Sequence, residues 1–243
     1  MASLENKNVL ITGSTRGLGL ALAKHCLAQK ASVTIHGSNS ESVEKALAEI
    51  DHENAKGVAA DLKKMESIET LFATIEEGDK PLDLFINNAG RTLTGSFLQQ
   101  KPSELVELMN INTRAPLLCA KHALALMAKN RAGTIINISS NAARTPMPLL
   151  ALYSATKAAL SAFSQAFRAE CAAEGVRLFW VEPGAIATEI TASYTDDFKE
   201  RYDGNIMRLN TDDVAEHILH LYRNDNINHQ HSVFEHFNIE TSL

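Results

Sequence analysis

Short apolar runs alternate along this chain with longer segments of helical periodicity, and this alternation constrains the fold more than any other feature. The runs VLIT, DLFI and TIINI are continuously apolar and do not alternate with polar residues. Strands have this composition when helices cover both faces of a parallel sheet. The order of elements therefore predicts an α/β fold with a doubly wound parallel sheet flanked by helices on both faces.

The expected elements follow one another without a break. Predicted strands cover residues 8–12, 31–36, 57–60, 82–86, 133–138 and 176–181. Predicted helices cover about 18–29, 41–50, 65–77, 103–129 and 153–174, and Pro116 lies near the middle of the fourth. Because no repeat, low-complexity tract or glycine- and serine-rich linker interrupts this order, a single domain over residues 1–243 is expected.

Composition excludes several functional classes. Apolar residues make up 45% of the 243 residues and charged residues 21%, which is an ordinary globular balance. A net charge of −6 provides no basic field that would attract nucleic acid or an anionic membrane. No apolar run is long enough to span a membrane, and the first residues do not resemble a signal peptide. Cys26, Cys119 and Cys171 are far apart, so we expect buried free thiols and a cytoplasmic location.

Glycines at positions 13, 17 and 19 stand between the first predicted strand and the first predicted helix. Glycines let the backbone turn tightly and approach a pyrophosphate, while the start of the helix offers unpaired N–H groups. The pattern is Gly-x-x-x-Gly-x-Gly. A glycine cluster alone could be only a tight turn, but its place in the first strand-to-helix turn favours a dinucleotide site.

Tyr153 and Lys157 are four residues apart in an alanine-rich predicted helix, so they lie on one face. A phenol has a reference pKa of about 10, and a nearby ammonium favours the phenolate, which suits proton transfer. Ser140 follows the strand over residues 133–138 and could hydrogen-bond a substrate oxygen. Taken alone, such a pair is more often a solvated helix face.

Five motifs together resemble the short-chain dehydrogenase/reductase family: TGSTRGLG at 12–19, NNAG at 87–90, Ser140, YSATK at 153–157 and PGAIAT at 183–188. The resemblance covers about residues 7–222. It implies a Rossmann-type domain and hydride transfer between a nicotinamide cofactor and a small-molecule carbonyl or alcohol. By this resemblance Tyr153 is the general acid or base, and Lys157 lowers its pKa and binds the nicotinamide ribose.

The resemblance also selects between neighbouring residues at two places. Ser140, thirteen residues before Tyr153, is expected to orient the substrate oxygen, while Ser139 is interpreted as structural. Asn112 is expected to link the lysine through water to a proton relay, and Asn110 is set aside.

Cofactor contacts are implied for residues of the glycine-rich turn and five later segments. These are Gly13, Ser14, Thr15, Arg16, Gly17, Leu18, Gly19, Ser38, Asn39, Asp61, Leu62, Asn88, Ala89, Gly90, Tyr153, Lys157, Pro183, Gly184, Ile186 and Thr188. Asp61 resembles the acid that contacts adenine, with a helix N-cap before Lys63 as the alternative. Thr188 resembles the threonine that holds the nicotinamide carboxamide.

The end of the second predicted strand bears on the choice of cofactor. A carboxylate there would bind a 2′-hydroxyl and repel a 2′-phosphate. The chain instead has His36-Gly37-Ser38-Asn39, with no acid before Glu41. Arg16 could reach a 2′-phosphate, so NADP(H) is favoured over NAD(H). The alternative is a solvated Arg16 and a pocket that tolerates either cofactor.

Substrate contacts are expected within and beside the same motifs. The candidates are Arg91, Ser140, Asn141, Met147, Leu150, Tyr153 and Ala185, together with a segment over about residues 185–210. Arg91 could anchor a substrate carboxylate or phosphate, and a surface salt bridge is an equal alternative. Arg144 is interpreted as a structural loop residue.

The last residues, INHQHSVFEHFNIETSL, depart from the family pattern because they lack its paired glycine. A short strand over residues 232–237 is expected. The two long helices predict a homodimer or homotetramer. The histidines at 217, 220, 229, 231 and 236 are interpreted as solvated or interface residues, and no metal site is expected.

The sequence thus predicts an NADP(H)-dependent carbonyl reductase, of the 3-oxoacyl or ketone reductase type. Two alternatives stay open. One is a regulator that binds NADP without turnover, and the other is an epimerase or dehydratase on a related scaffold.

Overall fold

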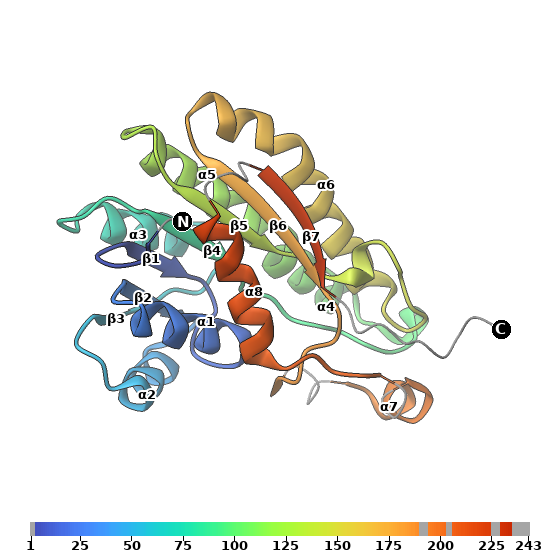
Figure 1. Cartoon of the computed structure of the whole chain (residues 1–243). Helices are drawn as coiled ribbons and strands as arrows, with labels where there is room; N and C mark the ends of the chain where they lie inside the picture. The colour runs from blue at the N-terminus through green and yellow to red at the C-terminus, as the bar shows by residue number, and fades with distance from the viewer. Residues whose placement is uncertain (1–2, 190–193, 203–205, 225–228, 235–243) are drawn as a thin grey trace.

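A single parallel sheet forms the centre of the protein, with helices on both sides (Figure 1). The computed structural model describes residues 3–189, 194–202, 206–224 and 229–234. The strands are β1 (Asn8–Ile11), β2 (Ser32–Gly37), β3 (Ala55–Ala59), β4 (Leu84–Asn87), β5 (Thr134–Ile138), β6 (Arg177–Pro183) and β7 (His229–Phe234). Their order in the sheet is β3-β2-β1-β4-β5-β6-β7, and all six pairings are parallel. The predicted fold class is confirmed.

Two hydrophobic clusters explain why the strands are apolar at successive positions. On one face, α1 (Gly17–Ala28), α2 (Ser40–Ile50) and α8 (Thr211–Arg223) contribute to the cluster that contains Val9 and Ile11. On the other face, α3 (Met65–Glu76), α5 (Ala115–Ala128) and α6 (Ala151–Ala173) contribute to the cluster that contains Leu10. Successive side chains of a strand point to opposite faces, so a sheet covered twice requires apolar residues throughout.

The predicted helix over residues 103–129 is helical without interruption to Ala128, but its hydrogen bonding is not α-helical throughout. It consists of α4 (Pro102–Met109), a π-helical turn (Asn110–Arg114) and α5. The N–H of Ala115 bonds the carbonyl of Asn110, five residues back. Pro116 has no N–H and cannot bond the carbonyl of Asn112, which fits a local departure from α-helical bonding at this place.

Smaller differences concern the ends of strands. β3 begins at Ala55 rather than residue 57, and β4 begins at Leu84 rather than residue 82. The expected strand over 232–237 is β7, which begins at His229 and pairs in parallel with β6. Residues 235–237 lie outside the described part of the chain.

The functional motifs meet at one edge of the sheet. β1, β4, β5 and β6 all run in the same direction, so the segments that follow their carboxyl ends share this edge. β1 lies between β2 and β4, which is where the strand order reverses. Doubly wound sheets bind ligands at this reversal point. Two shorter elements, a 3-10 turn (Asn141–Ala143) and α7 (Asp196–Tyr202), lie in the loops after β5 and β6.

Two further expectations concern the cysteines and the membrane. Cys26, Cys119 and Cys171 are buried and free, as predicted. Within the described ranges, no helix is both long and apolar enough to cross a bilayer.

Candidate active site

A cavity of about 680 Å³ lies at the carboxyl edge of the sheet, and most of the predicted site residues line it. Among the predicted cofactor, catalytic and substrate residues, the ones outside its lining are Ser14, Asn39 and Asn112. Ser14 is buried and bonds the carbonyl of Ile11, so its role is to hold the turn. The cavity therefore joins the glycine-rich turn to the catalytic residues in one continuous space.

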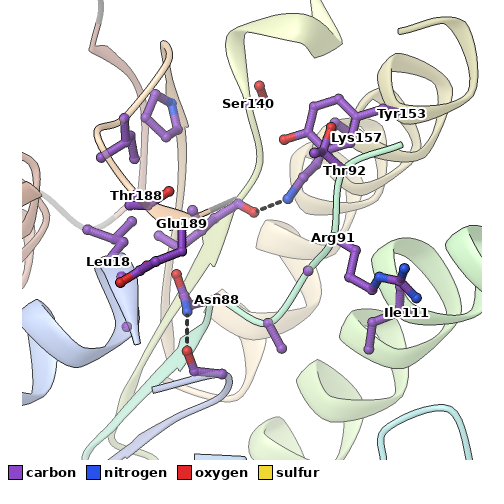
Figure 2. A pocket seen from close by; sticks show the side chains of 18 of the residues that line it. Leu18, Asn88, Arg91, Thr92, Ile111, Ser140, Tyr153, Lys157, Thr188 and Glu189 are labelled. Atoms are coloured by element: carbon purple, nitrogen blue, oxygen red, sulfur yellow. Dashed lines mark hydrogen bonds between the residues drawn. The ribbon is translucent and has the colours of Figure 1, made fainter. Parts of the chain in front are cut away.

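Tyr153 and Lys157 project from α6 near Ser140 (Figure 2). The Nζ atom of Lys157 lies 5.9 Å from the centroid of the Tyr153 ring and donates a hydrogen bond to the Ile138 carbonyl at 2.9 Å. Ser140 follows β5 and accepts a hydrogen bond from the N–H of Ala142 at 3.2 Å. Its side chain also hydrogen-bonds Tyr153. The structure thus brings together the three residues whose chemistry the sequence singled out.

Burial dominates the ionisation of both groups on α6. It raises the pKa of Tyr153 to about 12, while the hydrogen bond with Ser140 lowers this pKa and the nearby Tyr194 raises it. Burial also lowers the pKa of Lys157 to about 8. This differs from the expectation that Lys157 brings the Tyr153 pKa toward neutrality, because desolvation of the phenolate is the largest contribution.

Asn112 lies beneath the cavity, in the π-helical turn, and is 1% exposed. Its Oδ1 accepts a hydrogen bond from the N–H of Arg91 at 2.9 Å, and its Nδ2 donates to the carbonyl of Arg91 at 2.8 Å and to Oγ1 of Thr156 at 3.1 Å. Asn112 therefore holds the segment after NNAG against α6. Its expected link to the lysine through water stays a prediction.

Glycine-rich turn residues approach neighbouring backbone too closely for any side chain. A Cβ on Gly13, whose φ is +64°, would lie 2.9 Å from Cα of Ala89, and one on Gly19 would lie 2.3 Å from the carbonyl oxygen of Gly13. Asn88 ties NNAG to this turn, because its Nδ2 donates to the carbonyl of Thr12 at 2.9 Å. Gly13, Gly17 and Gly19 line the cavity without side chains, so the backbone at the start of α1 faces the cavity directly. We call this turn the glycine cradle.

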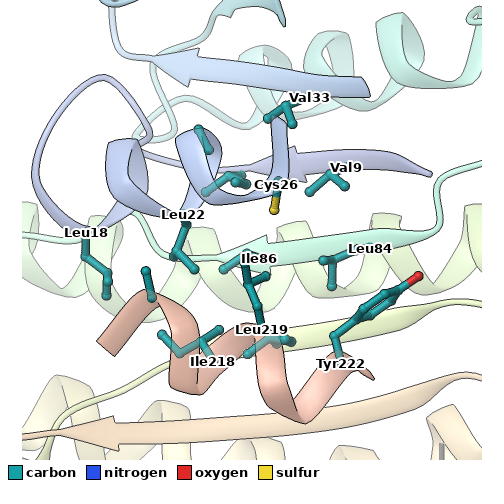
Figure 3. Packing of buried hydrophobic residues seen from close by; sticks show 14 of the residues in the cluster. Val9, Leu18, Leu22, Cys26, Val33, Leu84, Ile86, Ile218, Leu219 and Tyr222 are labelled. Carbon is teal, nitrogen blue, oxygen red and sulfur yellow. The ribbon is translucent and has the colours of Figure 1, made fainter. Parts of the chain in front are cut away.

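Packing holds α1 in place below this cradle. Leu22 and Cys26 of α1 lie in one cluster with Ile218 and Leu219 of α8 and with Val9 of β1 (Figure 3). These side chains are fully buried, so the start of α1 has a fixed position relative to the sheet.

His36 also positions the turn, and the sequence analysis missed this role. It is 2% exposed, and its Nδ1 accepts a hydrogen bond from the N–H of Gly13 at 3.0 Å. The Nε2 atom must therefore carry the proton and donate to the carbonyl of Ala60 at 3.0 Å. Burial lowers the pKa of His36 to about 4, so the ring is neutral near pH 7. This role follows from the pairing of β2 with β1 and β3, which brings His36 next to Gly13 and Ala60, and the spacing of these residues in the sequence does not indicate it.

The far end of the cavity, near Arg16 and Ser38, corresponds to the expected adenosine side. Arg16 is exposed there. Asn39 instead caps α2, because its Oδ1 accepts a hydrogen bond from the N–H of Ser42 at 2.9 Å. Asp61 lines the cavity and accepts from the N–H of Lys63 at 3.1 Å. Because Lys64 is the N-cap of α3, the helix-cap alternative for Asp61 is not realised.

On the substrate side, the salt-bridge alternative for Arg91 is realised. Its Nη1 lies 2.6 Å from Oε1 of Glu107, an oxygen that Lys63 also contacts. The cavity lining also includes Tyr194 and Phe198, whose rings pack edge to face with their centroids 4.7 Å apart. Both fall within the expected substrate segment, although residues 190–193 and 203–205 of that segment lie outside the described ranges.

The histidines near the end of the chain make ordinary polar contacts. Nε2 of His217 lies 2.7 Å from Oγ of Ser232, and Nε2 of His231 lies 2.8 Å from Oε2 of Glu182. Among the described residues, no group of three or more His, Cys, Asp or Glu is placed to hold a metal ion. The side chains of His229 and His236 lie outside the described part of the chain.

Comparison with known proteins agrees with this geometry. A family model described as short chain dehydrogenase matches residues 7–199. A 3-oxoacyl-[acyl-carrier-protein] reductase FabG of Haemophilus influenzae is 34% identical over 203 residues, which cover 84% of each chain. An uncharacterized oxidoreductase of Staphylococcus aureus is 29% identical and covers 90% of this chain and 92% of its own. Among solved structures, ElxO with NADP bound has a TM-score of 0.83 at 29% identity, covering 94% of this chain and 96% of its own.

Proposed function

Because the chain belongs to the short-chain dehydrogenase family, we propose that this oxidoreductase uses NADP(H) to interconvert a carbonyl compound and a secondary alcohol. One observation carries the proposal. Tyr153, Lys157 and Ser140 line the same cavity as the glycine-rich turn, so a proton donor and a dinucleotide site face one space. Reduction is the proposed direction.

The residues present fit a nicotinamide dinucleotide. The glycine cradle leaves backbone N–H groups at the start of α1 open to a pyrophosphate, and a Cβ at Gly13 or Gly19 would force the turn apart by colliding with Ala89 or with the carbonyl of Gly13. Asp61 and Asn88 would hold the adenosine half, and Lys157 and Thr188 the nicotinamide half. When bound, the cofactor supplies the hydride.

The chain's own residues handle the proton. Ser140 would donate a hydrogen bond to the substrate oxygen and hold it beside the Tyr153 hydroxyl. Tyr153 would give its proton to this oxygen as negative charge develops, which is why a phenol that stays protonated to about pH 12 suits reduction. Lys157, with its pKa near 8, is largely cationic at pH 7 and would favour the phenolate that remains.

Two features support NADP(H) over NAD(H). Arg16 lines the cavity as an exposed cation, and β2 ends in His36 and Gly37 rather than in a carboxylate. A neutral His36 does not repel a 2′-phosphate as an acid would. The similar solved structure, ElxO, has NADP bound.

We propose a 3-oxoacyl compound or a related ketone as the substrate. Relatives at 34% identity are named as 3-oxoacyl-[acyl-carrier-protein] reductases. The cavity beside Tyr153 is lined by Met147, Leu150 and Phe198, which suit an apolar chain next to the carbonyl.

A cytoplasmic homodimer or homotetramer completes the proposal. Three buried free thiols suit a reducing compartment. α5 and α6 are the long helices through which we expect copies of the chain to associate.

A turnover assay at 340 nm tests the function. The wild type and Tyr153→Phe are each mixed with NADPH or NADH and with acetoacetyl-CoA or simple ketones. We expect NADPH oxidation by the wild type and a loss of at least about a hundredfold in the variant. Tight NADPH binding with no turnover of any carbonyl would instead favour the regulator.

A further inference from the structure

Glu182 is a buried carboxylate that lies outside the cavity and is not used by the chemistry above. Its side chain is 1% exposed, at the end of β6 beside Pro183. Oε2 lies 2.5 Å from Nε of Arg144 and 2.8 Å from Nε2 of His231, and Oε1 accepts a hydrogen bond from Ser161 at 2.7 Å. One carboxylate therefore joins three elements.

Two of these elements carry the groups that face the substrate. Arg144 caps the 3-10 turn that begins after Ser140. Ser161 lies one helical turn beyond Lys157 on α6, and its hydroxyl is 2.8 Å from that of Ser139. Ser139 in turn donates to the carbonyl of Lys157 at 3.0 Å. The contacts run from Glu182 to both sides of the Ser140–Tyr153 pair.

The third element is the edge strand β7. His231 stacks on Trp180 of β6, with ring centroids 5.0 Å apart, while its Nε2 contacts Glu182. A buried carboxylate is strongly destabilising unless its partners stay in place, so the three elements are fixed together rather than merely adjacent.

We propose that Glu182 is a positioning residue, which holds the Ser140 loop against α6 and so sets the distance between Ser140 and Tyr153. This inference rests on the proposed function, because it assigns Glu182 a part in proton delivery. Small displacements of positioned groups slow a reaction strongly, so the effect of losing Glu182 should exceed a loss of stability alone.

Three variants separate positioning from folding. Glu182→Ala removes all three contacts. Arg144→Met removes only the contact to the loop, from a side chain that is 47% exposed, and leaves Glu182 with His231 and Ser161 as partners. Glu182→Gln keeps one amide oxygen that can accept from both Arg144 and His231, and its NH2 group can donate to Ser161, so this variant should rescue the function. The control is Glu49→Gln, which breaks the exposed Lys24–Glu49 ion pair of 2.7 Å.

Three measurements are needed, and two of them, the Kd for NADPH and amide hydrogen exchange, require no carbonyl substrate. The single-turnover rate of hydride transfer is measured by stopped flow with acetoacetyl-CoA at saturating NADPH, together with the Kd for NADPH. We expect Glu182→Ala and Arg144→Met to be slowed about tenfold or more with the Kd unchanged, and Glu182→Gln and Glu49→Gln to stay within about threefold of the wild type. In Glu182→Ala and Arg144→Met, amide hydrogen exchange should be faster than in the wild type in peptides that cover residues 139–147.

Either a wild-type rate per bound NADPH in Arg144→Met or unchanged exchange over residues 139–147 would overturn the positioning role. A wild type that reduces no carbonyl probe would count against the proposed function instead. The exchange measurement would then decide the role of Glu182 in holding the loop on its own.

Discussion

The ammonium of Lys157 donates a hydrogen bond to the carbonyl of Ile138 at 2.9 Å, which attaches α6 to the end of the strand that precedes Ser140. The cation is buried, and its pKa falls to about 8 from an ordinary value of 10.5. The folded protein gives up this proton at a lower pH than the unfolded chain does. Lys157 therefore penalises the folded state below pH 8, and the penalty is relieved as pH rises from 8 toward 10.5.

Substitution of Lys157 by Met should flatten this dependence. We expect the free energy of unfolding of the wild type to rise relative to that of Lys157→Met between pH 7 and pH 9.5, as measured by urea unfolding. Parallel curves for the two proteins would show that the Lys157 pKa is not lowered. Turnover should be lost in the same variant.

His36 should make the fold sensitive to acid in a lower range. Its pKa is about 4 in the folded protein against 6.5 ordinarily, so the unfolded chain takes up a proton first. Stability from neutral His36 is present above pH 6.5 and is lost as pH falls toward 4, by about 3 kcal/mol in total. His36→Gln should lose less stability than the wild type between pH 7 and pH 4. The exposed His52, changed to Gln, is the control and should follow the wild type.

Asn112 and Asn110 form a matched pair for testing the π-helical turn. Asn112→Leu strands the N–H and carbonyl of Arg91, which Asn112 now satisfies, and should lower the free energy of unfolding by about 3 kcal/mol. Turnover should fall with it, because Arg91 follows NNAG directly. Asn110→Leu changes a half-buried neighbour and should cost far less. The free energy of unfolding is measured by thermal and urea unfolding. Equal losses of stability in the two variants would show that the hydrogen bonds between Asn112 and the backbone of Arg91 do not stabilise the fold.

Arg16 should distinguish the two cofactors. If it contacts a 2′-phosphate, Arg16→Gln raises the Kd for NADPH about tenfold or more, which corresponds to about 1.4 kcal/mol, and leaves the Kd for NADH unchanged. Lys24→Gln removes a cation from α1, the helix that Arg16 precedes, at a position outside the cavity lining, and is the control. Fluorescence titration measures both constants. An equal loss for NADPH and NADH would mean that Arg16 contacts a part common to both.

The three cysteines offer a test of the packing. Burial raises the pKa of Cys26 and of Cys119 to about 12, and Cys171 is buried as well. Native protein should therefore react with a thiol reagent such as DTNB only as fast as it unfolds, and denatured protein should release three equivalents. Fast reaction of one thiol under native conditions would show that a helix opens locally.

The sequence predicted well those features that depend only on residues close together in the chain. Apolar runs indicate covered strands, and Tyr153 and Lys157 meet because a helix brings residues four apart onto one face. The glycines were informative for the same reason, since a strand, a turn and a helix follow one another in the chain.

What the sequence did not reveal depends on pairing between distant segments. His36 touches Gly13 only because β2 lies beside β1, and Glu182 meets His231 only because β7 extends the sheet beyond β6. The pKa of Tyr153 was misjudged for a related reason. Desolvation depends on everything that surrounds the hydroxyl, whereas spacing identifies only one neighbour.

The π-helical turn at Asn110–Arg114 also limits how descendants of this chain can vary in length. The turn accommodates one residue more than α-helical winding would. Deleting one residue there would let the helix close with α-helical bonding and keep α4 and α5 in phase, but it would change the direction of the Asn112 side chain and so break its hydrogen bonds to Arg91. Substitutions at neighbouring positions of this turn can therefore leave the site intact in descendants of this chain, whereas the insertion or deletion of a single residue cannot.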